Sequence, residues 1–499
     1  MYLWENMPFF LVIGSLIAAF VMAGFARWKK EWCPYLTIIS VGFSFILSSI
    51  LAYRVAGGEI INYYAGGWNP PWGIEMMIDE LGAMMLLLMT GSFLLIAIYS
   101  IKSIPREIPP SVSGWYYSCF LLTLSAMMGM VATNDFFNLF VMVEVTGIGA
   151  CGLVAAKGEK LSTEAALRYL ILSSIGATFL LFAIGFIYQI TGNLNMSYVA
   201  AELVQIKDQY PVIIWVTISF ITIGLGLKAA LFPLHIWLPD AHSSAPSASS
   251  AILSGLVVKV YIVSIMRLYF LVFGLDVFTG TYMRYLILIM ASLAILMGSF
   301  FAFVQVNLKR RLAYSTVAQI GYIFLGFGLG TVWGITAAML HIIIHAFMKV
   351  CLFLSAGAIY YQTGKKKVTQ FTGLGYQMPV TMGAFTIASL SMIGIPLFGG
   401  FISKYGLALG SLEANNPYFI ALIVLSGLLN AAYYLPMIWQ AFFVSQPKSQ
   451  PKAKLKLDAI PFSMLVPIMI TAAGVIYMGV FPGGALAFLE KAVSRFLLL

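Results

Sequence analysis

The chain has 499 residues, of which 61% are hydrophobic and only 9% are charged, and its mean hydropathy is +0.94. Soluble domains carry about 25% charged residues. A soluble fold of this length has too little interior for so much apolar surface, so the composition predicts a polytopic membrane protein. The apolar runs are long and do not alternate with polar residues, which favours an all-α fold over a barrel.

The four cysteines are scattered along the chain and form no CxxC pair. This spacing argues against a zinc site, an iron–sulfur cluster or a disulfide framework in this chain. No basic stretch precedes the first apolar run, which follows Glu5 directly. We therefore expect an uncleaved first helix and not a signal peptide.

About fourteen apolar segments are each long enough to cross a hydrocarbon layer of about 30 Å. The polar stretches between them are short, so no large soluble domain is expected. The predicted segments are 7–27, 33–53, 80–101, 113–133, 135–156, 165–190, 211–238, 246–275, 282–305, 312–330, 332–361, 380–410, 417–444 and 460–480.

Basic residues are concentrated in alternate connections between these segments. The connections that follow odd-numbered segments hold 18 of the 28 lysines and arginines, the opposite side holds 6, and 4 lysines lie inside segments. The positive-inside rule places the 18 in the cytoplasm and both termini outside a cell membrane. Because these residues are spread over short loops, the net charge of +10 reflects topology and does not indicate nucleic-acid binding. The 18 are Arg27, Lys29, Lys30, Lys102, Arg106, Lys157, Lys160, Arg168, Lys309, Arg310, Arg311, Lys365, Lys366, Lys367, Lys448, Lys452, Lys454 and Lys456.

The four lysines inside segments are Lys228, Lys259, Lys349 and Lys404, and one acid near the middle of a segment, Glu144, joins them. A charge at the bilayer centre costs about 2.5–3.5 kcal/mol on insertion scales, so these groups are expected to be functional. The alternative is that they lock helices together as structural ion pairs or extend to the membrane surface. One acid cannot neutralise four lysines, and burial lowers a lysine pKa, so these lysines are candidate proton carriers.

The eleventh segment contains "HIIIHAFMK", in which His341, His345 and Lys349 are spaced i, i+4 and i+8 on one helix face. Histidine titrates nearest to neutral pH, so this face is predicted to be a file of titratable groups. Two satisfied structural histidines are the alternative. A zinc site is not expected, since no third ligand and no HExxH glutamate stands nearby.

Two segments combine a lysine with a helix break. In "LKAALFPLHIWLPDAH" (227–242), Lys228 is followed by Pro233. In "GIPLFGGFISKYGL" (394–407), the breaking residues Pro396, Gly399 and Gly400 precede Lys404. These segments are the seventh and the twelfth, so they cross the membrane in opposite directions. Broken helices in corresponding positions of two inverted halves are typical of a transporter's ion path.

The stretch "LKAALFPLHIWLPDAHSSAPSASSAILSGLVVKVY" (227–261) resembles the signature of the antiporter-like subunits of respiratory complex I and of Mrp-type sodium/proton antiporters. Related subunits occur in membrane-bound hydrogenases and sulfur reductases. The glutamate of the fifth segment, "HIIIHAFMK" and "GIPLFGGFISK" share the resemblance, which covers roughly 75–430. It implies two inverted five-helix repeats, segments 4–8 and 9–13, with helices 7 and 12 broken. The implied parts are 1–112 (helices 1–3), 113–275 (first repeat), 276–445 (second repeat) and 446–499 (helix 14).

The resemblance also implies roles for individual residues. Glu144 would pair with Lys228, and Lys259 would connect this pair to the second repeat. The second repeat would continue the proton path, and a cytoplasmic loop would carry a proton uptake or coupling point. The residues implied for these two roles are His341, His345, Lys349 and Lys404 for the path, and His235, Asp240 and His242 for the loop.

Three functions are open at this point. The first is a proton-translocating subunit of a complex driven by redox partners. The second is a subunit of a gradient-driven Mrp-type Na+/H+ antiporter, and the third is an enzyme subunit that binds quinone. The last is disfavoured because the chain has no motif for a redox ligand. We expect no cofactor in this chain, other membrane subunits as partners, and iron–sulfur clusters only in peripheral redox subunits if those are present.

Overall fold

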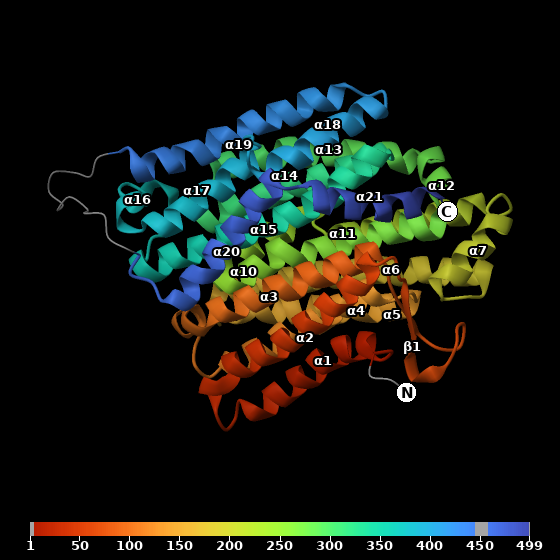
Figure 1. Ribbon diagram of the computed structural model, residues 1–499, viewed down its shortest axis with the longest axis horizontal. Coiled ribbons are helices and arrows are strands. Elements are labelled where there is room, and N and C mark those ends of the chain that lie inside the picture. The colour runs from red at the N-terminus through yellow and green to blue at the C-terminus, as the bar shows by residue number, and fades with distance from the viewer. Residues whose placement is uncertain (1–3, 445–457, 499) are drawn as a thin grey trace.

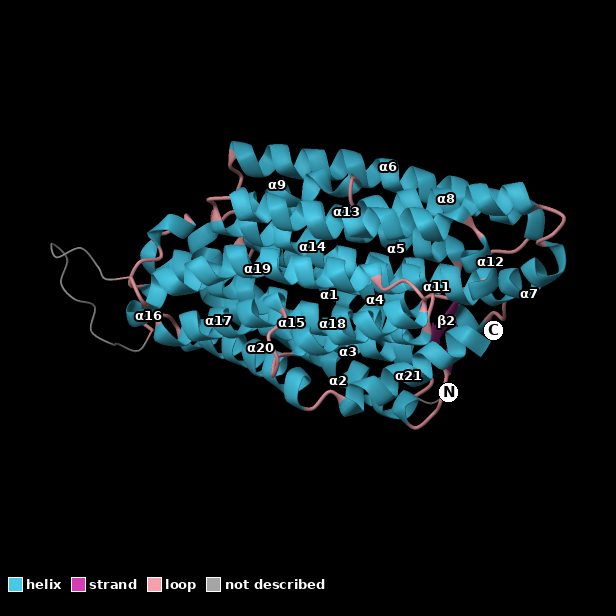
Figure 2. Cartoon of the chain, turned by 90° about the horizontal axis from the view of Figure 1, so that it is seen from above, coloured by secondary structure: helices cyan, strands magenta, loops and turns pink. Residues whose placement is uncertain are grey.

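The computed structural model describes residues 4–444 and 458–498. In this part of the chain the protein is a bundle of long, roughly parallel helices with a small β-hairpin at one end (Figures 1 and 2). Thirteen of the described helices are long and apolar enough to cross a membrane. The one remaining predicted segment, the twelfth (380–410), is divided between α17 (Pro379–Ile393) and α18 (Gly399–Glu413). The prediction of an all-α polytopic membrane protein is confirmed.

The membrane-spanning elements follow the predicted order along the chain. The first seven are α1 (Met7–Phe25), α2 (Cys33–Ala56), α3 (Glu80–Glu107), α4 (Ser113–Ala132), α5 (Phe136–Ala155), α6 (Lys160–Thr191) and α8 (Pro211–Lys228). The eighth is assembled from α10 (Ser247–Ile252), the π-helical turn η4 (Leu253–Val257), α11 (Val258–Arg267) and the π-helical turn η5 (Leu268–Phe273). The rest are α13 (Tyr282–Val304), α14 (Leu308–Leu329), α15 (Val332–Thr363), the α17–α18 pair, α19 (Tyr418–Phe442) and α20 (Phe462–Val480).

Short elements fill the connections. They are η1 (Lys30–Trp32), η2 (Ala65–Gly67), α7 (Met196–Ile206), η3 (Leu234–Trp237), α9 (Leu238–Ser244), α12 (Leu275–Gly280), η6 (Val368–Gln370), α16 (Leu374–Gln377) and α21 (Gly483–Leu498). Neither α7 nor α21 is among the predicted segments. Helix α1 begins and α21 ends at the same end of the bundle (Figure 1).

The interior of the bundle is formed by three elements. The eighth span, α14 and α15 are almost entirely buried, whereas α1, α2 and α19 lie at the periphery (Figure 1). The buried spans carry Lys259, His341, His345 and Lys349, so most of the predicted titratable groups lie in the protein core and not against lipid.

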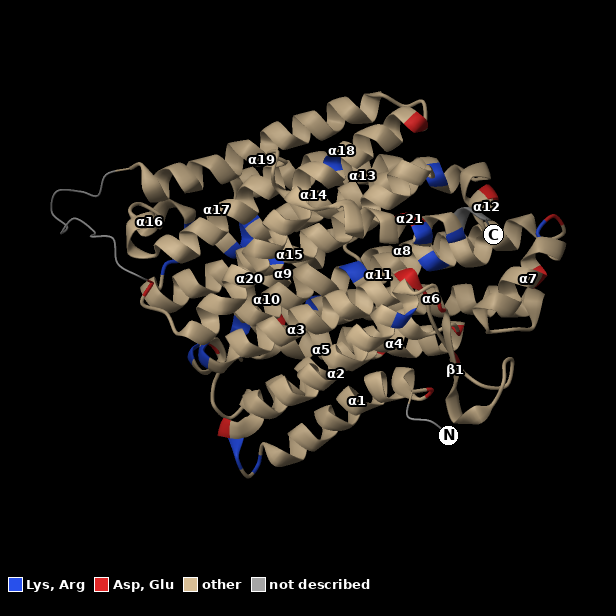
Figure 3. Cartoon of the chain, in the orientation of Figure 1, with Lys and Arg blue, Asp and Glu red and all other residues tan. Residues whose placement is uncertain are grey.

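Basic residues from distant connections gather at one end of the bundle (Figure 3). Residues 157–168, 307–310 and 365–366 line one cavity there. Because α14 begins at Leu308, four residues before the predicted start, Lys309 and Arg310 lie in its first turn and not in a loop. The predicted basic connection with Lys448, Lys452, Lys454 and Lys456 lies outside the described residues.

The opposite end is closed by a hairpin that the hydropathy pattern did not predict. Strands β1 (Ile61–Tyr64) and β2 (Glu75–Ile78) pair antiparallel, with Ile61 opposite Ile78. The buried Glu75 carboxylate accepts hydrogen bonds from Asn134 at 2.8 Å and from Asn195 at 2.7 Å. These bonds fasten the hairpin to the residues that precede α5 and α7.

A buried ion pair joins this end of α3 to the eighth span. Asp79 Oδ1 lies 2.7 Å from Arg267 Nη2 and also accepts from the Gly82 N–H at 2.7 Å, which caps α3. The two charged side chains are 2% and 7% exposed. Removing one partner of such a pair leaves the other charge buried and uncompensated.

We therefore expect Asp79→Ala to destabilise the protein by about 3–5 kcal/mol and to lower the midpoint of its thermal unfolding in detergent. Asp276→Ala is the matched control, because Asp276 pairs with Lys207 at 2.6 Å while its side chain is 70% exposed. That pair should contribute no more than about 1 kcal/mol. Equal unfolding midpoints for the two variants would contradict this prediction.

Candidate functional site

Glu144 of α5 and Lys228, the last residue of α8, form an ion pair. The Lys228 ammonium lies 2.9 Å from Glu144 Oε1 and donates to Ser173 Oγ of α6 at 2.7 Å. The Lys228 side chain is fully buried, whereas the Glu144 side chain is 31% exposed at the outer face of the bundle. A change in the environment of Glu144 at that face can therefore alter the electrostatic stabilisation of the buried Lys228 ammonium.

The helix break begins at Lys228 itself, five residues before Pro233. Ala230 has a left-handed backbone (φ 56°), and the Leu231 N–H donates to Gly226 O at 2.9 Å. Trp237 of η3 folds back, with its indole N–H 2.9 Å from Leu227 O. The Lys228 side chain is thus held at the end of a half-helix, where main-chain carbonyls are free to accept other donors.

Lys259 lies in α11, next to the π-helical turn η4. Its ammonium donates to the main-chain oxygen of Ser254 in that turn. A π-helical turn interrupts the regular α-helical ladder and is frequent at functional sites. Ser254 Oγ lies 2.7 Å from Thr316 Oγ1 of α14, and the ring of Tyr261 lies 5.9 Å from Lys228 Nζ. The eighth span therefore stands between Lys228 and the second half of the bundle.

The predicted polar face of α15 is present and fully buried. The rings of His341 and His345 are stacked with centroids 5.6 Å apart. Lys349 donates to Leu312 O at 2.9 Å and to Ser315 Oγ at 2.5 Å, both in α14. His345 lies between His341 and Lys349 along this face of α15.

His341 connects this face to the second broken span. His341 Nδ1 and Ser403 Oγ of α18 are 2.8 Å apart. The adjacent residue, Lys404, donates to the main-chain oxygens of Met392 and Ile393 at 2.8 and 2.9 Å. These are the last carbonyls of α17, so the ammonium satisfies acceptors that the break sets free.

The residues of the second break have defined roles. The segment between Ile393 and Gly399, which contains Pro396, is not helical. A Cβ at Gly400 would lie 1.9 Å from Ser391 O, so only glycine permits this approach of α18 to the end of α17. Helix α18 begins at Gly399, and Lys404 lies in its second turn.

The three residues expected on a loop lie in short helices instead. His235 belongs to η3, and Asp240 and His242 belong to α9. Both histidines are buried, His235 beside Phe232 and His242 beside Phe353. Asp240 is partly exposed and lies between Arg168 at 3.0 Å and Arg310 at 3.4 Å. Because the chain turns back after Lys228, this segment packs inside the bundle. The proline-containing stretch that was predicted to be a loop is therefore helical and largely buried.

Several polar partners of these groups were not found from the sequence. They are hydroxyl groups buried beside the titratable side chains: Ser173, Ser315, Tyr322 and Ser403. Tyr322 lies under Lys404 with its ring centroid 4.9 Å from Nζ. Ser315 and Tyr322 are seven residues apart, which places them two turns apart on one face of α14. This spacing could have identified a polar face of α14 from the sequence.

The seven predicted path residues fall into two groups and one separate residue. One group is the Glu144–Lys228 pair, and the other consists of the polar face of α15 and Lys404. Lys259 lies in the eighth span, which packs against both α8 and α15. Only one carboxylate accompanies the four buried lysines of this set. Such groups can hold and release protons but cannot all be charged at once in a low dielectric.

The chain is similar to known membrane proteins over most of its length. The family model described as NADH:quinone oxidoreductase/Mrp antiporter, transmembrane, matches residues 133–430. The chain is 40% identical over 471 residues to NADH-quinone oxidoreductase subunit N of Desulforudis audaxviator, covering 89% of this chain and 91% of the relative. It is 31% identical over 475 residues to a Na(+)/H(+) antiporter subunit of Alkalihalophilus pseudofirmus, covering 94% and 93%.

A solved structure has the same fold. A chain of the membrane-bound sulfane sulfur reductase, an archaeal respiratory membrane complex, matches with a TM-score of 0.90 and 31% identity, covering 99% of this chain and 98% of that one. The family match includes Glu144, Lys228, Lys259, His341, His345, Lys349 and Lys404. The chain therefore belongs to the NADH:quinone oxidoreductase/Mrp antiporter transmembrane family.

Proposed function

We propose that the chain is a proton-translocating, antiporter-like subunit of a multisubunit respiratory-type membrane complex, in which redox reactions of partner subunits supply the energy. The observation that carries this proposal is the Glu144–Lys228 pair at the start of a series of buried cationic groups. Two of the relatives named above support it: one is a subunit of an NADH-quinone oxidoreductase, and the other is a chain of an archaeal respiratory membrane complex. No cofactor of this chain is part of the proposal.

The pair acts as the switch. While Glu144 is ionised, it stabilises the protonated form of Lys228, which is fully buried. When Glu144 is neutralised or moves away, the ammonium loses its counterion in a low dielectric, and release of its proton becomes favourable. Ser173 Oγ remains at 2.7 Å as a hydrogen-bonding partner of the neutral amine.

The released proton passes to Lys259 and then along α15. The neutral form of each acceptor is accessible because none of Lys259, Lys349 or Lys404 has an acidic partner among the described residues. His345 and His341 would link Lys349 of α15 to Lys404 at the second break. Water in the polar gaps beside the two breaks would bridge steps longer than a hydrogen bond.

Proton uptake is proposed at the basic end, near the segment from η3 to α9. Asp240 is the partly exposed acid there, and His235 and His242 lie behind it. We infer that this end faces the cytoplasm and that both termini lie outside a cell membrane, because the basic end should lie on the cytoplasmic side.

A partner subunit is proposed to cover Glu144. Its side chain shares an exposed stripe of α5 with Phe137, Val141 and Ile148. A carboxylate facing lipid hydrocarbon is strongly unfavourable, so this stripe is suited to a protein neighbour. The transport path would then be sensitive to movement of that neighbour.

The two breaks also support two inverted repeats, residues 113–275 and 276–445, flanked by 1–112 and 446–499. Both broken spans place a lysine at the break, Lys228 at the end of α8 and Lys404 in α18. The five-span offset between them reverses their direction.

The first test is purification of the native complex in mild detergent, with subunit identification and an absorbance scan for iron–sulfur clusters. Clusters and peripheral redox subunits are the expected result. A cluster-free assembly of small membrane subunits that collapses a pH gradient in response to sodium would support the second candidate, an Mrp-type Na+/H+ antiporter, which the similarity to the Alkalihalophilus antiporter protein favours.

His341→Leu is expected to lower proton transport by at least about tenfold, because it removes the imidazole that is hydrogen-bonded to Ser403 of α18. Ser403→Ala removes the hydrogen bond but keeps the imidazole, so a smaller loss is expected. Flux per complex should be measured in proteoliposomes. Equal losses for the two variants would indicate that His341 acts only through this hydrogen bond.

A further inference from the structure

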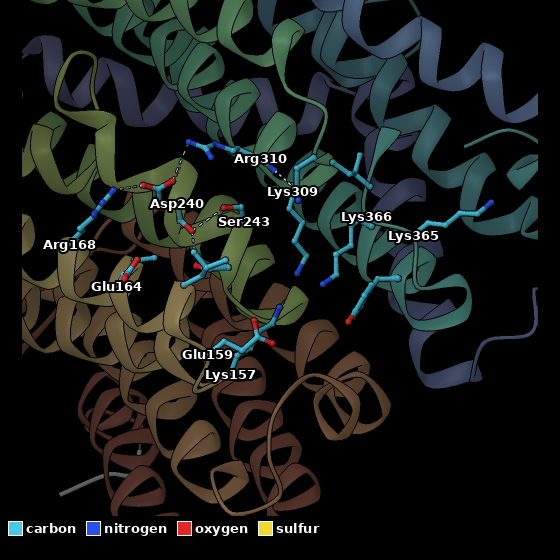
Figure 4. Close-up of a pocket in the computed structure, with 17 residues that line it drawn as sticks. Lys157, Glu159, Glu164, Arg168, Asp240, Ser243, Lys309, Arg310, Lys365 and Lys366 are labelled. Carbon is cyan, nitrogen blue, oxygen red and sulfur yellow. Dashed lines mark hydrogen bonds and ion pairs between the residues drawn. The ribbon is translucent and has the colours of Figure 1, made fainter. Parts of the chain in front are cut away.

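A cavity of about 420 Å³ lies at the basic end of the bundle, beside the proposed uptake residue Asp240. The starts of α6 and α14, helix α9 and the end of α15 surround it (Figure 4). Six basic and three acidic side chains line it, so its wall is strongly positive. They are Lys157, Arg168, Lys309, Arg310, Lys365 and Lys366, with Glu159, Glu164 and Asp240.

The basic side chains that line the cavity outnumber the carboxylates with which they form ion pairs. Glu107, buried behind the cavity, lies 3.8 Å from Lys157 and 3.7 Å from Lys309. Both of its oxygens also accept from the Ser247 N–H, at 3.1 and 3.0 Å. On the other side, Asp240 is shared by Arg168 and Arg310, as described above. Four cations therefore share two carboxylates.

Three ammonium groups converge, and the only carboxylate paired with any of them among the described residues is Glu107, which Lys157 and Lys309 share. Figure 4 shows the side chains of Lys157, Lys309 and Lys366 directed into the same space. Lys366 has no ion pair among the described residues, and its charge lies 4.9 Å from the ring of Tyr360. The Nε of Arg310 is buried and has no hydrogen-bond partner in the described part of the chain. Like charges held together in this way favour a bound anion with several acceptor oxygens.

We propose that this cavity binds the phosphate group of an anionic phospholipid. A phosphate group has the charge and the acceptor oxygens that the three lysines and Arg310 require. Beyond Arg168, an apolar stripe on the same face of α6 leads away from the cavity: Ile171 and Ile175 lie three and seven residues after Arg168 and are 54% and 43% exposed. This stripe is suited to acyl chains, which favours a lipid over free phosphate. Basic pockets between helices on the cytoplasmic side bind such headgroups.

The test uses the purified full-length chain in its complex. Native mass spectrometry would count bound phosphatidylglycerol and phosphatidylcholine for the wild type, for Lys309→Gln, for Lys366→Gln and for the double variant. Each substitution is expected to weaken phosphatidylglycerol binding about fivefold. Lys102→Gln is the control, because Lys102 is exposed on α3 outside the cavity. Lys366→Gln alters an exposed residue after α15, so it tests the site without a folding defect.

A second arm distinguishes the source of the phosphate. Inorganic phosphate is titrated without lipid, and protection of Lys309 from amine labelling is measured. The lipid site is supported if the wild type retains phosphatidylglycerol in preference to phosphatidylcholine. This preference should be weaker in each single variant and absent in the double variant. If inorganic phosphate protects Lys309 but phosphatidylglycerol is not retained, the lipid proposal is overturned and the cavity is a site for a soluble phosphate. Equal lipid binding by all variants, or a crosslink from Lys366 to an acidic partner segment, overturns the proposal.

Discussion

Replacing Glu144 with glutamine is expected to abolish proton transport while the complex still assembles. The substitution keeps the shape of the side chain but removes the carboxylate that pairs with the fully buried Lys228. Each 1.4 kcal/mol of lost interaction changes an equilibrium by about a factor of ten, so a loss of at least about tenfold in transport is expected. Because Glu144 is 31% exposed, solvent and neighbours screen part of the interaction, and its removal should not unfold the chain.

The measurement is proton uptake into proteoliposomes, normalised to the amount of assembled complex. Glu31→Gln is the matched control, since Glu31 is an exposed carboxylate between α1 and α2. Lys228→Ala should give the same loss as Glu144→Gln, because each variant removes one half of the same pair. A normal rate in either variant, at normal protein level, would exclude the pair as the switch.

Lys404→Met is expected to have the second large effect. Its ammonium is hydrogen-bonded to Met392 O and Ile393 O, which the break in the twelfth span sets free. Methionine fills a similar volume but carries no proton and donates no hydrogen bond. Transport should therefore fall by at least about tenfold, and the unpaired carbonyls should cost about 1–3 kcal/mol of stability.

The two effects of Lys404→Met can be separated. Lys404→Arg keeps donors for the carbonyls of α17 but is not deprotonated in proteins, so it should restore thermal stability without restoring transport. Lys102→Met serves as the control for loss of a lysine at an exposed site. Recovery of transport in Lys404→Arg would mean that the residue acts by capping α17 and not by carrying a proton.

The spanning helices were predictable because hydrocarbon requires long apolar runs whose main-chain groups are satisfied within each helix. Both breaks were also predictable, since Pro233, Pro396, Gly399 and Gly400 do not suit a helix interior. The β-hairpin, α7 and α21 were not predictable. The hairpin depends on contacts far along the chain, such as those of Glu75 with Asn134 and Asn195, which hydropathy does not contain.

The candidate site was predictable to a similar degree. Charged residues inside apolar segments are rare, so Glu144 and the four lysines were visible at once. Serine and tyrosine are common in membrane helices, so Ser173, Ser403 and Tyr322 carried no such signal. The π-helical turns around Lys259 and the cavity at the basic end arise from packing between distant segments, and no local pattern specifies them.

Lys259→Met tests the central claim most directly, because Lys259 hydrogen-bonds only to Ser254 O of its own span among the described residues and has no acidic partner there. A structural role for its charge is therefore small, whereas a continuous path from Lys228 to Lys404 requires it. Proton flux of the complex in proteoliposomes should fall to the background leak, with unchanged assembly and thermal stability. Wild-type flux in this variant would contradict a proton path through the buried lysines.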